Sequence, residues 1–178
     1  MSRLSMIAVD EAKGELADLF RRIEEGFGWV PNAYATLGSN SPGLLACVLQ
    51  TRPILLASCG LRAPEIAAIN VAVSAHSKSD YCVAEQGVAA RASGFSAEQT
   101  ISLCAGHYPE DARLDALIQF ALRLVDGAGT LPGAALEDIR SAGYSDEQIV
   151  GVIGAISIIL FNNMFNRVND TPIDFPNS

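Results

Sequence analysis

The segment Leu61–Gly94, LRAPEIAAINVAVSAHSKSDYCVAEQGVAARASG, decides the fold that we predict for this chain. Its apolar residues between 65 and 75 fit two patterns, because they alternate over Ile69–Val73 as in a strand and also line one face of a helix. The alanines, and the lack of a clear partner strand elsewhere, favour the helix. A second helix is expected over Ser79–Gly94, so the segment predicts two consecutive helices.

Helical signals continue on both sides of this pair. Apolar residues recur at helical spacing from Ala12 to Ile23 and predict an amphipathic helix that ends before Pro31. Ser41 followed by Pro42 predicts a second helix, because a serine hydroxyl caps a helix and proline suits its first turn. Further helices are expected over Ser96–Ala105, Pro109–Asp126, Pro132–Ala142 and Ser145–Val168, followed by an extended tail over Thr171–Ser178. The sequence therefore predicts an all-α helical bundle.

Two short stretches of the chain resemble each other. Arg91–Gln99 reads RASGFSAEQ, and Arg140–Gln148 reads RSAGYSDEQ. Each predicts a helix end, a glycine suited to the residue after it, and an S-x-x-Q capping box that opens the next helix. In the second copy, Tyr144 and Ile149 are spaced as a hydrophobic staple. The pair suggests an internal helix-turn-helix duplication, and chance recurrence of good capping residues is the alternative.

Size and composition indicate one compact domain. The chain has 178 residues, of which 49% are hydrophobic and 18% charged, so it can bury a good core and also pack against copies of itself. We treat residues 1–178 as a single domain with N-terminal helices (1–60), a central helix pair (61–94) and C-terminal helices with a tail (95–178).

Charge and hydropathy argue against several classes of function. The net charge of −8 and the pI of about 4.6 argue against binding to nucleic acid or to anionic membranes. The longest apolar run, Ile149–Phe161, is too short to span a bilayer and indicates a buried helix. No secretory leader is evident in the charged, amphipathic N-terminal region, and the scattered cysteines suit a reducing cytoplasm.

Cys82 is the candidate reactive residue. If Ser79 is the N-cap of its helix, Cys82 is the third helical residue, and the Ser79 hydroxyl is expected to accept its backbone N–H. The helix dipole favours a thiolate at that position, and a protonated His76 would assist. The carboxylates of Asp80 and Glu85 oppose it, so the residues alone leave the direction of the pKa shift open.

The remaining cysteines and histidines predict no metal or cofactor site. Cys47, Cys59 and Cys104 lie in apolar helical stretches and are interpreted as small core side chains. The two histidines, His76 and His107, and the scattered thiols do not have the spacing of zinc ligands. We therefore expect no bound metal or cofactor.

The segment Leu61–Gly94, with EI-x-AIN-x-x-VS followed by Tyr-Cys, resembles the core of the carboxymuconolactone decarboxylase and alkylhydroperoxidase AhpD-like superfamily. It is most similar to an uncharacterised, peroxidase-related branch of that superfamily. The similarity covers nearly the whole chain, and it implies an all-helical fold that forms homo-oligomers. Four further motifs fit in order: GWVPN at 28–32, GFSAEQ at 94–99, FNNMFNR at 161–167 and PIDFP at 172–176.

The resemblance also implies a site that has lost most of its chemistry. Peroxidase members use a C-x-x-C pair, a histidine four residues after the second cysteine, and an upstream glutamate. The second cysteine becomes a sulfenic acid and the first resolves it as a disulfide, while the other two residues relay protons. Carried onto this chain, the reactive cysteine matches Cys82, the resolving cysteine matches Ser79 and the histidine matches Gln86. The glutamate matches Ala67, with Glu65 a neighbouring acidic position.

Three functions remain open at this point. The first is a diverged, non-catalytic member that binds an unknown small molecule. The alternative is a one-cysteine peroxidase-like oxidoreductase, in which a hydroperoxide oxidises Cys82 and an external thiol reduces it. Lactone-acid decarboxylation ranks last, since His76 is the only nearby candidate base. His76 either replaces the lost proton relay from another direction or makes ordinary hydrogen bonds in a turn.

Overall fold

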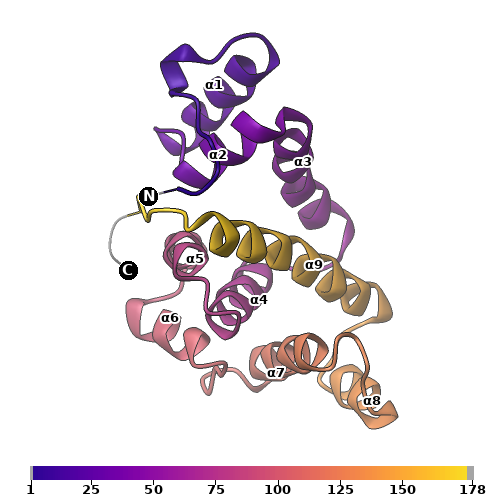
Figure 1. The fold of residues 1–178 in the computed structure, drawn as a ribbon. Helices are drawn as coiled ribbons and strands as arrows, with labels where there is room; N and C mark the ends of the chain where they lie inside the picture. The colour runs from indigo at the N-terminus through magenta and orange to yellow at the C-terminus, as the bar shows by residue number, and fades with distance from the viewer. Residues whose placement is uncertain (1, 176–178) are drawn as a thin grey trace.

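The computed structural model describes residues 2–175, and over that range it is all-helical, as predicted (Figure 1). A short 3-10 helix, η1 (Val9–Glu11), precedes the first α-helix. The α-helices are α1 (Glu15–Phe27), α2 (Asn32–Asn40), α3 (Pro42–Ser58), α4 (Ala63–His76), α5 (Asp80–Ala92), α6 (Ala97–Cys104), α7 (Ala112–Asp126), α8 (Gly133–Ser141) and α9 (Asp146–Asn169).

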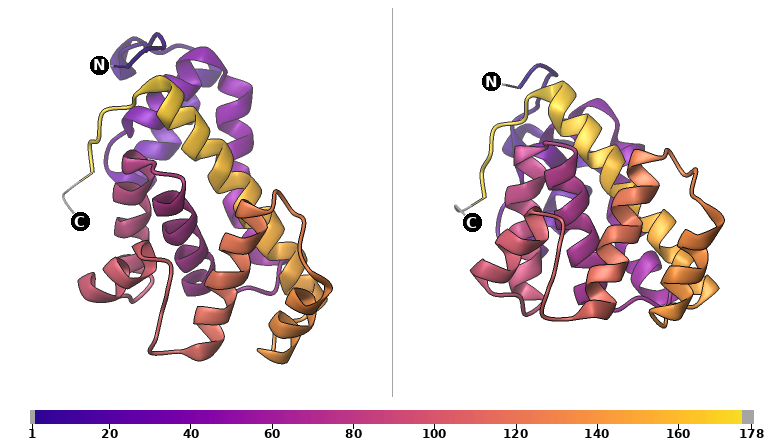
Figure 2. Two further views of the ribbon diagram at one scale, coloured as in Figure 1. Left: turned by 60° about the horizontal axis from the view of Figure 1, so that its bottom comes forward. Right: turned by 90° about the horizontal axis from the view of Figure 1, so that it is seen from below.

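Helices α4 and α9 form the centre of the fold. Figures 1 and 2 show α9 running across the molecule, with α1–α3 on one side and α4–α8 on the other. Helix α4 packs against α5, α6, α7 and α9, and nearly all of its residues from Glu65 to Ser74 are buried. A helix covered on all sides needs no single apolar stripe. This explains why residues 65–75 also resemble a strand in sequence.

Helix α9 meets the length and composition of a membrane-crossing helix. Its position in the fold indicates another role, because it packs against α3, α4, α5 and α7 and buries Val152, Ala155, Ile156 and Ile159. Core helices of globular proteins pass the same test of length and hydropathy. The segment Ile149–Phe161 is helical as predicted, but only one of its faces is buried, because Val150 is 68% exposed and Ile153 49%.

The predicted capping residues form most of the expected hydrogen bonds. Ser41 caps α3, and Asp111 caps α7 by accepting the backbone N–H groups of its first turn, which places the start of α7 after Pro109. Both capping boxes are present, at Ser96 and at Ser145. The glycine before each box has a positive φ, 104° for Gly94 and 90° for Gly143. Local structure is thus repeated at both sites, while the duplication itself stays a prediction.

Helix α2 was not predicted. Its sequence, NAYATLGSN, contains several weak helix formers and lies between the break predicted before Pro31 and the helix start predicted at Ser41. In the structure its apolar residues pack on α1 and α3, and a Cβ added at Gly38 would lie 2.6 Å from Leu45. Tertiary packing, rather than intrinsic propensity, therefore accounts for this helix. The tail is extended from Thr171 to Phe175, and residues 176–178 of the predicted tail lie outside the described range.

Candidate functional site

Cys82 lies in the first turn of α5, as predicted, and is completely buried. Its apolar neighbours include Ala33 of α2 and Phe175 of the tail. On the polar side, the Nδ2 amide of Asn166 in α9 donates a hydrogen bond to the Cys82 Sγ over 3.3 Å. Three segments distant in sequence therefore enclose this thiol.

The environment of Cys82 favours the protonated thiol. Burial raises its pKa from 9.0 to about 11, and the charge of Glu85 acts in the same direction. The hydroxyl of Ser79 and the amide of Asn166 lower it but do not compensate for the burial. The helix dipole alone would favour the thiolate, so desolvation decides the direction that the sequence left open.

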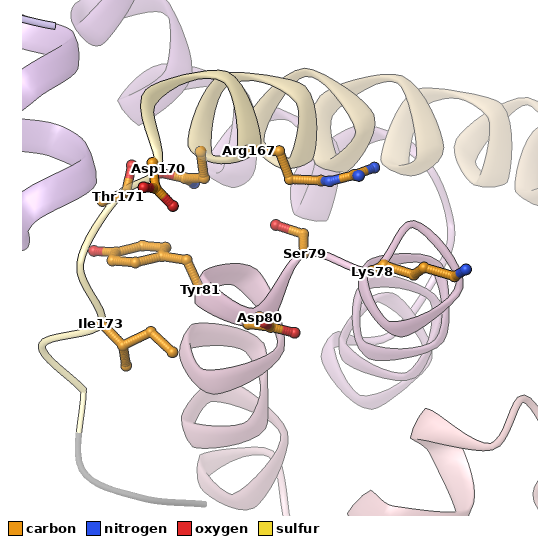
Figure 3. A pocket seen from close by; sticks show the side chains of 9 residues that line it. Lys78, Ser79, Asp80, Tyr81, Arg167, Asp170, Thr171 and Ile173 are labelled. Carbon is orange, nitrogen blue, oxygen red and sulfur yellow. The ribbon is translucent and has the colours of Figure 1, made fainter. Parts of the chain in front are cut away.

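Ser79 precedes α5 but does not cap it through its side chain. The predicted hydrogen bond from the Cys82 backbone to the Ser79 hydroxyl is therefore wrong. The Ser79 backbone N–H donates to the Ser74 carbonyl over 3.1 Å, which holds the residue in the turn. Only 1% of Ser79 is exposed, and its Oγ forms no hydrogen bond of normal geometry among residues 2–175, although it lies close enough to the Cys82 sulfur to lower the pKa of that thiol. Figure 3 shows this hydroxyl pointing into the space between α9 and the start of α5.

That space is a pocket of about 350 Å³, which we call the Ser79 pocket. It is lined by residues 78–81 at the start of α5, by residues 166, 167 and 170 at the end of α9, and by residues 171 and 173 of the tail (Figure 3). Its rim carries two cations, Lys78 and Arg167, and two carboxylates, Asp80 and Asp170. The charges balance, so the pocket selects no net charge.

Asn166 connects this pocket to the buried thiol. It lines the pocket, it is 4% exposed, and its Nδ2 donates to Cys82. Its Oδ1 has no partner within the described part of the chain. Ser79 and Asn166 both line the pocket and both act on the thiol, whereas Cys82 itself does not line it. The two side chains thus stand between the pocket and Cys82.

Gln86 lies on the same face of α5 as Ser79 and Cys82, one turn further along, but belongs to a different polar cluster. Its Oε1 accepts a hydrogen bond from Asn70 Nδ2 over 3.1 Å. Both residues line a small cavity of about 70 Å³ between α3, α4, α5 and α9. Gln86 therefore does not reach the Ser79 pocket.

Glu85 is a buried acid in that second cluster. From the sequence alone, we interpret it only as a negative charge that opposes a thiolate at Cys82. The Tyr34 hydroxyl donates to Glu85 Oε1 over 2.9 Å. Burial raises the pKa of Glu85, and the hydrogen bonds from Tyr34 and Gln86 lower it by less. Tyr34 lies 51 residues away on the unpredicted helix α2, so no local sequence signal indicated this pair.

His76 is not brought to the thiol. Its Nε2 lies 2.7 Å from Asp126 Oδ1 at the exposed end of α4, and His76 does not line the Ser79 pocket. At the other end of α4, Glu65 is buried and bonded to Arg62 and Arg113. Ala67 lies in the apolar core. Of the sequence-predicted residues, the structure therefore assembles Ser79 with Cys82, while a role for His76 in catalysis stays a prediction.

Comparisons with known proteins show the fold. No protein-family model and no curated protein matches this sequence. A solved structure from Ralstonia eutropha JMP134, described as an alkylhydroperoxidase AhpD core and uncharacterised peroxidase-related protein, superposes with a TM-score of 0.87 at 20% identity. The alignment covers 97% of this chain and 92% of that one. A peroxidase-related protein from Silicibacter sp. TM1040 gives a TM-score of 0.79 at 21% identity, covering 97% and 94%.

A third solved structure carries a ligand. The debrominase Bmp8, in a complex with 2,3,4-tribromopyrrole, is similar to this chain with a TM-score of 0.75 at 18% identity, covering 98% of this chain and 92% of the other. At such identities the likeness establishes the fold, which is the AhpD-like helical fold that the sequence predicted.

Proposed function

We propose that this chain, which has the AhpD-like fold, binds a small molecule in the Ser79 pocket without peroxidase turnover. One observation carries the proposal: Ser79 and Asn166 line a pocket of about 350 Å³, and each has a buried polar atom, Oγ and Oδ1, that forms no hydrogen bond of normal geometry among residues 2–175. An unsatisfied buried polar atom costs about 1–3 kcal/mol, and a ligand that bonds to both atoms recovers that cost. The volume falls within the usual range for small-molecule sites, about 300–1,000 Å³.

The surroundings of Cys82 disfavour peroxidase turnover. A peroxidatic cysteine reacts as the thiolate, and here burial raises the pKa of the thiol to about 11. Position 79 has no sulfur to resolve a sulfenic acid, and Gln86 cannot titrate. The buried acid Glu65 forms salt bridges with Arg62 and Arg113 and is therefore not available to relay protons. Acid–base assistance is worth about 10²–10⁴-fold, so these substitutions remove most of the expected rate.

The two unpartnered atoms define the ligand chemistry. The Ser79 hydroxyl can donate or accept, whereas Asn166 Oδ1 only accepts, so the ligand must offer at least one N–H or O–H group. Tyr81 and Ile173 supply apolar surface beside them. The debrominase Bmp8, which has a similar structure, is in complex with 2,3,4-tribromopyrrole, an aromatic ring with one N–H. This complex supports the proposal of a ligand of similar size and chemistry. We therefore propose a small aromatic molecule with an N–H or O–H donor.

Thermal shift against halogenated pyrroles, phenols and small aromatic carboxylates tests the proposal. A ligand at 100 times its Kd adds about 2.7 kcal/mol, which raises the Tm of a chain of this length by roughly 5–10 °C. Ser79→Ala should lose that shift, and Ser93→Ala, at the far end of the same helix, should keep it. The proposal fails if no compound shifts the wild type, or if Ser79→Ala responds as the wild type does.

A second candidate function follows from the hydrogen bond between Asn166 and Cys82. An amide donor stabilises a thiolate, and local opening would expose Cys82 to a hydroperoxide. The thiolate would displace an alkoxide from ROOH, giving a sulfenic acid and, after protonation, ROH. Two external thiols would then return it to the thiol with release of water and one disulfide. A dimedone adduct at Cys82, formed with peroxide and absent in Cys82→Ala, supports this chemistry, and its absence in the wild type excludes it.

We also propose that the chain forms a homo-oligomer through α3. This helix is apolar, yet Leu44, Ile54 and Leu56 are exposed, and only Leu45 is fully buried. Covering such a surface is the usual driving force for association. Light scattering after gel filtration should give a mass above one subunit, and Ile54→Lys should reduce it. The cytoplasmic location inferred from scattered cysteines stays a prediction; all four are free thiols in the structure.

A further inference from the structure

A second concave surface runs along the opposite side of α9. It consists of two adjoining cavities, of about 760 Å³ and 350 Å³, which share Val125 of α7 and Leu160 of α9 as lining residues. Ile153, Leu160, Met164 and Val168 follow each other at helical spacing along the α9 side. We call this surface the α7–α9 groove. From Ile153 to Val168 it extends about 22 Å, at 1.5 Å per residue.

The body of the α7–α9 groove is apolar and open to solvent. Met164 is 62% exposed and Val168 64%, although both belong to a helix whose other face is the core of the fold. The end formed by the smaller cavity is lined by aliphatic side chains and small residues only, apart from Ser157. A bound hydrocarbon or aromatic group would remove this surface from water, at about 25 cal/mol per Å².

The other end of the groove is polar, and among residues 2–175 one of its cations has no acidic partner. Arg3 and His76 also line it, but they pair with Asp170 and Asp126. Arg167 donates to the backbone carbonyl of Ser77 over 3.0 Å and forms no salt bridge within residues 2–175. Its remaining guanidinium N–H groups are therefore free to bind an anion in this otherwise acidic protein.

Asn163 supplies an independent observation at the same end. It lines the larger cavity, it is 1% exposed, and neither its Nδ2 nor its Oδ1 has a hydrogen-bond partner in the described structure. Buried side-chain amides are almost always satisfied, so this one indicates a polar group supplied from outside the described residues. An amide N–H and a guanidinium placed together suit a carboxylate.

We propose that the α7–α9 groove binds an amphipathic monocarboxylate. The carboxylate head bonds to Arg167 and Asn163, and the hydrocarbon or aromatic tail lies along Leu160, Val125 and Ile153. This site is distinct from the Ser79 pocket, although Arg167 borders both. Figure 3 shows the Arg167 guanidinium extending away from Tyr81 and Thr171, which leaves it available to the groove.

Calorimetric titration of the full chain with decanoate tests the site. We expect binding near one molecule per chain, with weak or no binding of decanol, which lacks the carboxylate, and of propionate, which lacks the tail. Arg167→Gln should weaken decanoate about 10-fold or more, because a charge-assisted hydrogen bond is lost. Asn163→Leu should weaken it as well, and it removes a buried unpartnered amide, so this variant should remain folded.

Two control variants make the result specific. Arg123→Gln removes the same charge from an exposed position of α7 outside the groove and should leave the affinity unchanged. Ser79→Ala should also leave it unchanged, which separates this site from the Ser79 pocket. The proposal is overturned if decanol binds as well as decanoate or if Arg167→Gln and Asn163→Leu bind as the wild type does. It is also overturned if decanoate does not bind because a second copy of the chain occupies the groove.

Discussion

The Cys82 thiol should react slowly at neutral pH, and the structure gives the size of the effect. With a pKa of about 11 instead of 9.0, its thiolate fraction at pH 7.4 falls about 100-fold. A more basic thiolate is a better nucleophile, and a Brønsted coefficient of 0.4–0.5 returns about 10-fold over two pKa units. The raised pKa therefore slows the reaction of Cys82 at pH 7.4 by about 10-fold. Complete burial slows the reaction further, because the reagent must wait for local opening.

The assay is pyridyl disulfide labelling of the native protein, quantified at each cysteine-containing peptide by mass spectrometry. Cys47, which is exposed, provides the internal comparison. We expect Cys82 to label at least about 10-fold more slowly than Cys47, and its rate should still rise at pH 10. In urea the difference should disappear, since it arises from burial. A Cys82 rate that levels off below pH 9, or that equals the rate of Cys47, would refute the reasoning.

Three further predictions concern stability, measured by urea unfolding. Burial raises the pKa of Glu85, so its contribution to the free energy of unfolding is fully present below about pH 4.5 and is lost as pH rises through the pKa of the folded state. Glu85→Gln does not titrate, so its stability relative to the wild type should increase as pH rises. Burial alone would raise the pKa of Glu65, but its hydrogen bonds and ion pairs with Arg62 and Arg113 lower it. Glu65→Ala should therefore cost about 1.5–3 kcal/mol at pH 7, because these charge-assisted hydrogen bonds are lost, and less in acid. Gly151→Ala should cost about 1–3 kcal/mol at all pH values, because its Cβ would lie 2.6 Å from Cys59 Cβ. An unchanged urea midpoint in any of these variants contradicts the corresponding contact.

Sequence reasoning succeeded where structure is determined by neighbouring residues. Ser41, Ser96 and Ser145 predicted helix starts because capping depends on groups within three residues of each other. It failed at α2, whose helix depends on burial against α1 and α3. It also failed at the Ser79 hydroxyl, which has the sequence context of a cap but faces a pocket instead.

The candidate site shows the same division. The resemblance to a C-x-x-C-x-x-x-H motif singled out Ser79, Cys82 and Gln86, and the structure places Ser79 at the Cys82 thiol but Gln86 in a separate polar cluster. The partners from other helices were missed, because contact between segments far apart in the chain leaves no local pattern. One signal was available: Asn163 and Asn166 lie three residues apart in the segment 161–167 of α9, FNNMFNR, which indicates a shared polar face.

The unpartnered atoms of the Ser79 pocket distinguish a structural role from a binding role. If Ser79 and Asn166 served only the fold, two buried groups costing about 1–3 kcal/mol each would consume a large share of a typical stability of 5–15 kcal/mol. A structural role requires that Ser79→Ala destabilise the protein, since it would remove a useful contact. A binding role requires the reverse, in that Ser79→Ala stabilises the free protein and weakens the ligand. Within residues 2–175 the Ser79 hydroxyl forms no hydrogen bond of normal geometry, and its effect on the nearby Cys82 thiol is too small to offset the burial of that thiol. We therefore expect Ser79→Ala to stabilise the free protein and to weaken the ligand.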